Sequence, residues 1–158
     1  MSSEVLKTHE EQVAFVDDAL ARAEDLRKKK AYGEAISLLV EALRYGLEKA
    51  KIYYRLGNVY IDGGDLARAE YAYNRALEMD PNFVNAMHNL AVVYRRQKKM
   101  SLYVKTYKKS QRMAIKNPHT TSFNRDQKRR IRRLSVRVFF WMAAGVVVIL
   151  GIVWLAMR

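Results

Sequence analysis

The sequence predicts an all-α protein in which a helical solenoid is followed by a linker and a single C-terminal transmembrane helix. Three observations predict this class. The 158 residues include only two prolines and seven glycines, and no segment alternates apolar and polar side chains as a half-buried strand does. Residues 50–81 have the pattern of two helices joined by a glycine turn. Residues 138–157 are twenty consecutive positions without a charge.

Residues 50–81 place large and small apolar side chains where two antiparallel helices can pack against each other. Because helix backbones approach closely only at small residues, we expect Gly57 to meet Ala69 where the helices cross. Ala76 should face the next helix pair. The large apolar residues that fill the remaining grooves are Tyr53, Leu56, Tyr60 and Tyr73.

The ends of these helices are marked by turn and capping residues. Gly63-Gly64 should end the first helix, and Asp65 can cap the second. Pro81 should end the second helix, after which Asn82 can cap the next one. Near the N-terminus, Thr8 followed three residues later by Glu11 forms a capping box, which predicts a helix start.

The stretch 50–81 resembles the tetratricopeptide repeat, a helix–turn–helix unit of about 34 residues. Shifting the pattern by one unit in each direction implies further repeats at residues 16–49 and 84–117. The resemblance therefore implies a three-repeat solenoid over residues 10–117, preceded by a polar tail at 1–9. In the third repeat we expect the second helix to run from about Met100 to Ile115.

The resemblance also implies a binding site. Members of this family bind peptides or protein surfaces on the concave face formed by the first helix of each repeat. Asn58 and Asn89 fall where chaperone-binding members hold a peptide backbone with two asparagines, a residue that offers both donor and acceptor. Those members need a lysine where Tyr54 stands, so a protein or peptide other than an acidic chaperone tail is expected. The candidate groove residues are Tyr54, Arg55, Asn58, Asn85, His88 and Asn89; the same face of the first repeat includes Glu24 and Arg27.

The C-terminal third predicts a membrane anchor. Residues 118–137 are interpreted as a linker and a basic juxtamembrane helix, and residues 138–157 as the span, since twenty helical residues cover about 30 Å. Basic residues remain on the cytoplasmic side, which places the repeats in the cytosol. The prediction is a single-pass, tail-anchored protein of a bacterial inner membrane or a eukaryotic organelle membrane. The basic cluster before the span is Lys128, Arg129, Arg130, Arg132, Arg133 and Arg137.

The basic cluster has three interpretations. Its position beside the span favours a topology signal in contact with anionic lipid headgroups. A nucleic-acid site is disfavoured, because no base-stacking aromatic residues are interleaved with the charges. A partner-binding segment is the remaining alternative.

No catalytic or metal-binding constellation is present in the sequence. The chain has no cysteine, and His9, His88 and His119 are far apart and lack metal-ligand spacing. We expect neither an enzyme nor a bound metal or cofactor.

The sequence therefore predicts a membrane-anchored adaptor that binds a protein or peptide partner through its concave groove. The alternative is a structural subunit of a larger membrane assembly. A polar groove with Asn58 and Asn89 pointing inward would favour the adaptor. An exposed apolar patch on the convex face or on the helix from Met100 to Ile115 would favour the subunit.

Overall fold

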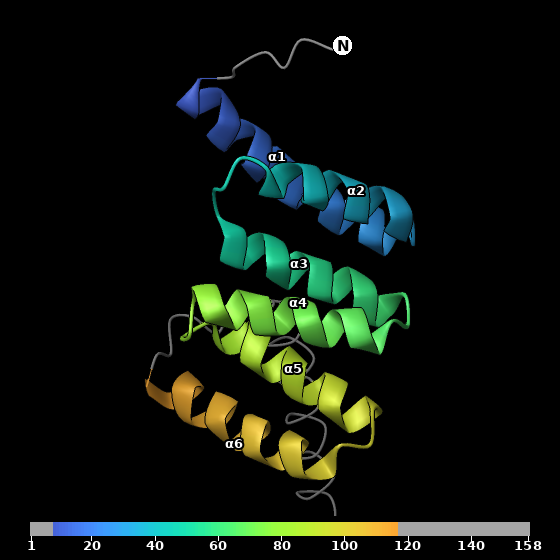
Figure 1. Ribbon diagram of the computed structural model, residues 1–158, viewed down its shortest axis with the longest axis vertical. Coiled ribbons are helices and arrows are strands. Elements are labelled where there is room, and N and C mark those ends of the chain that lie inside the picture. Colours follow the sequence, from blue (N-terminus) through green and yellow to red (C-terminus); the bar gives the residue numbers. More distant parts are fainter. Residues whose placement is uncertain (1–7, 117–158) are drawn as a thin grey trace, which may run out of the picture. The chain divides into compact units, whose positions relative to one another are not determined.

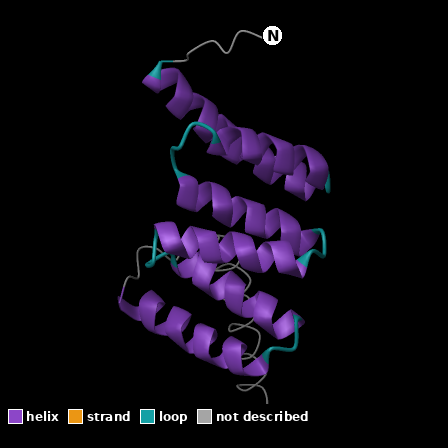
Figure 2. Cartoon of the chain, viewed as in Figure 1, coloured by secondary structure: helices purple, strands orange, loops and turns teal. Residues whose placement is uncertain are grey.

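The computed structural model describes residues 8–116, which lie within the first of two compact units, Met1–Thr121. Helices make up all the regular structure of this described part, and short loops join them (Figure 2). The all-α prediction is confirmed for these residues. The helices, labelled in Figure 1, are α1 His9–Lys28, α2 Tyr32–Leu43, α3 Lys49–Asp62, α4 Leu66–Met79, α5 Val84–Arg96 and α6 Met100–Lys116.

The six helices form three consecutive helix pairs. Each helix contacts the next one along the chain, and in addition α1 contacts α3 and α3 contacts α5 (Figure 1). The first helices of the three pairs are therefore neighbours. We call the surface that α1, α3 and α5 share the first-helix face.

The backbone repeats with a period of 34 residues. The turn inside each helix pair contains one residue in the left-handed region, at Lys30, Gly64 and Lys98, with φ of 64°, 85° and 61°. The next residue in each turn donates its N–H to a carbonyl five residues earlier, at 2.9 Å in every case. These bonds satisfy carbonyls at the end of the first helix that would otherwise lack a partner. The three bonds are Ala31 to Leu26, Asp65 to Tyr60 and Lys99 to Tyr94.

Two predicted helix starts are confirmed. The Glu11 N–H donates to Thr8 Oγ1 at 3.3 Å, and the Thr8 N–H donates to the Glu11 carboxylate at 2.8 Å, which completes the capping box. The Asp65 carboxylate accepts the N–H of Arg68 at 2.9 Å and so caps α4. Both contacts are local, so neither depends on the packing of distant elements.

The predicted cap at Asn82 is wrong. The residue that precedes α5 is Phe83, which makes no side-chain capping bond. The Asn82 N–H instead donates to the Asp80 carboxylate at 2.9 Å. Asp80 thus forms a local turn around Pro81, and this turn extends the loop to Phe83 before α5 begins.

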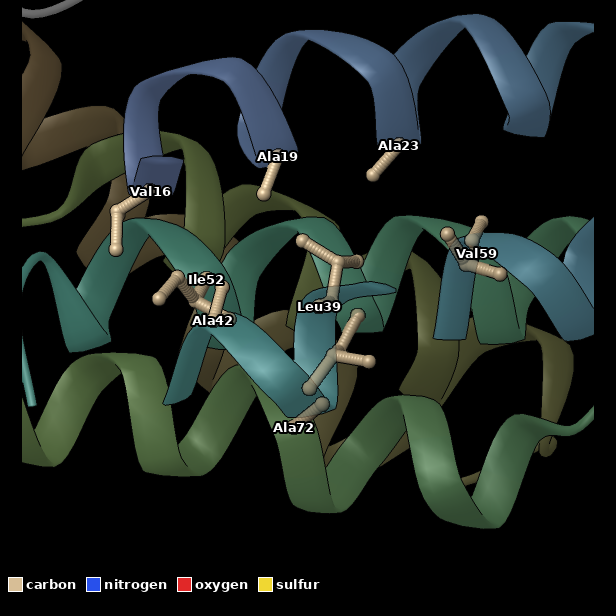
Figure 3. Close-up of a cluster of buried hydrophobic side chains, with 10 residues drawn as sticks. Val16, Ala19, Ala23, Leu39, Ala42, Ile52, Val59 and Ala72 are labelled. Atoms are coloured by element: carbon tan, nitrogen blue, oxygen red, sulfur yellow. The ribbon is translucent and has the colours of Figure 1, made fainter. Parts of the chain in front are cut away.

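The N-terminal core is lined by small and branched side chains from α1 to α4. Figure 3 shows Val16, Ala19 and Ala23 of α1 above Leu39 of α2 and Ile52 of α3. All five side chains are almost completely buried. The alanines let the helices approach closely, while the larger residues fill the space between them.

A second core lies between α4 and α5. The atoms nearest to a Cβ built on Gly57 belong to the Tyr73 ring, at 2.5 to 2.8 Å. Gly57 therefore accommodates the Tyr73 ring, and the predicted contact of Gly57 with Ala69 stays a prediction. Ala69 and Ala76 are fully buried beside Leu90 of the next repeat. The large tyrosine ring fills the space left by the missing Cβ.

The predicted linker, basic cluster and span lie outside the described residues. Within residues 8–116, no helix is both long enough and apolar enough to cross a membrane.

Candidate binding face

Polar side chains join neighbouring first helices at the same place in consecutive repeats. Glu24 of α1 accepts a hydrogen bond from Arg55 of α3 at 2.8 Å. One repeat later, Asn58 of α3 accepts a hydrogen bond from Asn89 of α5 at 2.9 Å. Each pair is separated by 31 residues, and both lie on the first-helix face. The first interface is therefore ionic and the second is neutral.

Asn58, Asn89 and Tyr73 form a compact polar cluster between the second and third repeats. The Tyr73 hydroxyl donates to Asn58 Oδ1 at 2.8 Å, and Asn89 Nδ2 lies 3.4 Å from the same hydroxyl. The exposed fraction of Asn58 is 9%, and Tyr73 is fully buried. A buried amide must be hydrogen-bonded to be tolerated, and Tyr73 supplies that bond to the carbonyl side of Asn58.

The cluster still has unused hydrogen-bonding groups. Among residues 8–116, neither the Asn58 amide N–H groups nor Asn89 Oδ1 has a protein partner. Asn58 keeps a small exposed fraction and Asn89 is half-buried, so the pair lies at the edge of the core. One amide donor and one carbonyl acceptor next to each other are what an extended peptide backbone requires.

Burial keeps Tyr73 in its neutral form. Removal from water raises the pKa of the Tyr73 phenol well above its ordinary value, and this outweighs the opposing hydrogen bond with Asn89. The hydroxyl therefore keeps its proton, and its hydrogen bond to Asn58, at about pH 10, where an ordinary tyrosine is half ionised. It fixes the orientation of the Asn58 amide, with its carbonyl toward Tyr73 and its nitrogen free.

The predicted groove residue Arg55 is engaged by the first repeat. Its guanidinium binds Glu24, which also accepts a hydrogen bond from Arg27 at 2.7 Å. Arg27 in turn binds Asp62 of α3. Burial raises the pKa of Glu24, but the hydrogen bond from Arg27 and the charges of Arg27 and Arg55 outweigh it and leave that pKa below its usual range. An acidic ligand would therefore compete with Glu24 for Arg55.

The remaining candidate residues lie on α3 and α5, the two helices that carry the asparagine pair. Tyr54 is half-buried, with its ring 4.8 Å from Phe83 and 6.1 Å from Tyr73 between ring centroids. His88 is exposed, and its ring lies 5.9 Å from that of Tyr107 on α6. Asn85 is half-buried on α5. The structure thus brings Tyr54, Asn58 and Asn89 around Tyr73 and places Arg55 with the first repeat.

Sequence reasoning missed the role of Tyr73 and the pairing of first helices. The sequence pattern predicts only packing for Tyr73, whereas its hydroxyl orients Asn58. The signal that would reveal the pairs is the separation of 31 residues, three less than the repeat. Three residues are close to one helical turn. A side chain on one first helix therefore bonds to a residue that lies about one turn before the equivalent position on the next first helix.

Two profiles of one protein family match the chain. Both are described as tetratricopeptide repeat; one matches residues 50–83 and the other residues 72–102. Residues 50–102 therefore match the tetratricopeptide repeat, and the first helix pair lies outside both matches. The matched stretch runs from α3 into α6 and includes Asn58, Tyr73 and Asn89.

Three curated proteins are similar to this chain. The photosystem I assembly protein Ycf3 of Cyanophora paradoxa is 29% identical over 96 residues, which cover 59% of this chain and 53% of that protein. The uncharacterized protein ycf37 of Pyropia yezoensis is 32% identical over 68 residues, 43% of this chain and 38% of its own length. Ycf3 of Rippkaea orientalis is 30% identical over 69 residues, covering 42% and 40%. The matches span about half, or less, of these relatives.

Proposed function

We propose that this protein is a membrane-anchored tetratricopeptide adaptor that holds a protein or peptide partner on its first-helix face during assembly of a membrane complex. The observation that carries the proposal is the asparagine pair. Asn58 and Asn89 present a free donor and a free acceptor side by side, held in place by buried Tyr73. Such a pair can bond both polar groups of one extended backbone segment.

The relatives indicate the kind of complex. Two of them are named photosystem I assembly proteins, so the partner that we propose is a subunit of photosystem I or of a comparable membrane complex. An assembly factor holds its partner only for a time. A small polar contact that is formed on a fixed scaffold suits such transient binding, because few groups must be released.

The anchor is the second part of the proposal. The twenty uncharged residues at 138–157 would form the span, with the basic cluster on the cytosolic side. The first-helix face would then capture its partner close to the membrane into which the partner is assembled.

Site-specific crosslinking in native membranes tests the binding face. A photoreactive amino acid at His88, which is exposed on α5, should crosslink to a subunit of a membrane complex, identified by mass spectrometry. The same probe at Tyr71, which is 62% exposed on α4, is the control and should not. Crosslinks from position 71 alone would move the binding site away from the first-helix face.

The asparagine pair is tested by substitution once the partner is known. Asn58→Ala with Asn89→Ala should weaken binding about ten-fold or more, since each lost hydrogen bond is worth roughly 1 kcal/mol. The double variant also leaves the Tyr73 hydroxyl unpaired and lowers stability. Leu39→Ala is therefore the control, because it lowers stability from the N-terminal core and leaves both amides and the Tyr73 hydroxyl in place. Equal losses of affinity in the double variant and in Leu39→Ala would mean that stability, and not backbone recognition, explains the effect.

A structural subunit remains the second candidate. The exposed apolar residues of α6, among them Val104 and Ile115, favour it, because a neighbouring subunit would cover them. Stable co-purification of the protein with a mature complex in fixed stoichiometry would support a subunit, whereas release on completion of assembly would support the adaptor.

A further inference from the structure

One side of α6 is largely apolar and exposed. Met100, Val104, Tyr107 and Ile115 lie along this side, and their exposed fractions are 54%, 44%, 37% and 80%. We call these four residues the α6 stripe. The exposed Gln111 lies between Tyr107 and Ile115 on the same side. Tyr73, which precedes Tyr107 by one repeat of 34 residues, is fully buried in the core that α4 shares with α5.

The side of α6 next to the stripe is cationic. It carries five basic residues and α6 contains no acid. None of the five makes an ion pair or hydrogen bond through its side chain with another residue of the described part of the chain. Their spacing of three, one, three and four residues keeps them on one side of the helix. These residues, which we call the α6 cations, are Lys105, Lys108, Lys109, Arg112 and Lys116.

The charge of the repeats is strongly uneven along the stack. Residues 8–83 contain eleven Lys and Arg against fourteen Asp and Glu, so the first two repeats are mildly acidic. Residues 84–116 contain nine Lys and Arg and no acid. The positive end of the domain is therefore α5 and α6. An anionic surface would attract this end and repel the opposite one, which orients the domain before any contact forms.

We infer that α6 lies on an anionic lipid surface, with the α6 stripe at the boundary between headgroups and acyl chains and the α6 cations at the lipid phosphates. A helix with an apolar side and an adjoining lysine-rich side suits this location, since long lysine side chains can reach the headgroups while their stems cover apolar surface. The inference rests on the proposed function in one respect: the predicted span at 138–157 would hold α6 near the bilayer.

Charge argues against the other occupants of the stripe. Residues 125–137 of the same chain contain seven basic groups and one acid, so docking them on α6 would bring like charges together. A second copy of α6 would do the same. An acidic protein surface has the right charge and is the outcome to be separated from lipid by experiment.

Spin labels on single cysteines test the inference in the full chain. The chain has no cysteine of its own. Val104→Cys places a label on the α6 stripe, and Val40→Cys on α2 is the matched control, because the two valines are exposed by 44% and 49%. Each labelled chain is reconstituted in phosphatidylcholine vesicles with or without phosphatidylglycerol. Collisions of the label with oxygen, which concentrates in the acyl region, are compared with collisions with a water-soluble nickel chelate.

The label at position 104 should prefer oxygen in vesicles that contain phosphatidylglycerol, and the label at position 40 should prefer nickel in both kinds of vesicle. Lys105→Gln with Lys108→Gln and Lys109→Gln should abolish the oxygen preference at position 104. The matched triple, Lys28→Gln with Lys29→Gln and Lys30→Gln at the end of α1, should leave it unchanged. Loss of the preference in both triples would mean that total charge, and not α6, governs the contact.

A nickel preference at position 104 in phosphatidylglycerol vesicles would overturn the inference and leave a protein partner for the stripe. Shielding of position 104 from both reagents in detergent would overturn it too, since the stripe would then be covered by protein. Flotation of the chain with vesicles distinguishes loss of the α6 contact from loss of the membrane anchor. A chain that floats with phosphatidylcholine but keeps position 104 in water retains the anchor without the α6 contact. A chain that floats only with phosphatidylglycerol, with position 104 immersed, retains the α6 contact without the anchor.

Discussion

At the scale of the residue, the same left-handed turn position is occupied by glycine once and by lysine twice. Gly64 takes φ of 85° without a steric penalty, whereas Lys30 and Lys98 take φ of 64° and 61° with a Cβ present. For a residue other than glycine this conformation costs roughly 1–2 kcal/mol. The first and third repeats therefore carry local strain that the second one avoids.

Lys98→Gly should raise the free energy of unfolding by about 1 kcal/mol, because glycine removes the clash at this turn. Urea unfolding followed by circular dichroism measures the change. Lys29→Gly is the control: Lys29 has φ of −78°, so glycine there brings only its entropic cost and should lower stability. A loss of stability in Lys98→Gly as large as in Lys29→Gly would contradict the assignment of strain.

Tyr73 makes stability depend on pH in the alkaline range. Burial raises the pKa of the folded tyrosine above the unfolded value of about 10, so the folded state holds its proton more tightly. This contribution to stability is complete below about pH 10 and is lost as the pH rises above that value. The melting temperature should fall above this pH, and the fall should be smaller in Tyr73→Phe. Tyr71→Phe, at an exposed tyrosine of α4, should behave like the parent protein. An identical alkaline slope in all three proteins would contradict a special role for Tyr73.

At the scale of the element, the packing of α3 against α4 depends on a missing methyl group. A Cβ on Gly57 would lie 2.5 Å from the Tyr73 ring, closer than any real contact allows. Tyr73 is fully buried and bonded to Asn58, so it has little room to move. Two effects oppose each other on substitution: a gain of helix propensity and a loss from overpacking.

Gly57→Ala should lower the free energy of unfolding, since overpacking costs about 1–3 kcal/mol and the propensity gain is at most about 1 kcal/mol. Gly33→Ala is the matched control on α2, where a new Cβ would have no atom within 4 Å. That variant should be neutral or more stable. The melting temperatures of the two variants test this prediction. Equal shifts in both variants would mean that the Tyr73 ring can move away from the new methyl group.

At the scale of the whole molecule, the described repeats form one part of a longer chain whose C-terminal residues predict an anchor. Deleting residues 138–158 should release the protein into the soluble fraction after a wash in about 1 M salt, which shortens the reach of charge interactions to roughly 3 Å. Release at high salt but retention at low salt would agree with an additional ionic contact through α6. A truncated protein that stays with membranes at high salt would place the anchor elsewhere.

The sequence by itself determined the helical class, the turn at Gly63-Gly64 and the caps at Thr8 and Asp65. These features depend on contacts within a few residues, so local chemistry is sufficient to predict them. The resemblance to tetratricopeptide repeats added the 34-residue period, which the backbone confirms at Lys30, Gly64 and Lys98.

Only the tertiary structure decided which side chains meet across helices. It paired Gly57 with Tyr73, Asn58 with Asn89, and Arg55 with Glu24. These contacts depend on how far one first helix is shifted along the next. The packing sets this shift, and the 34-residue period of the sequence does not specify it. The same packing left the end of α6 uncovered within the described residues, since each helix pair buries its surface only against its neighbours.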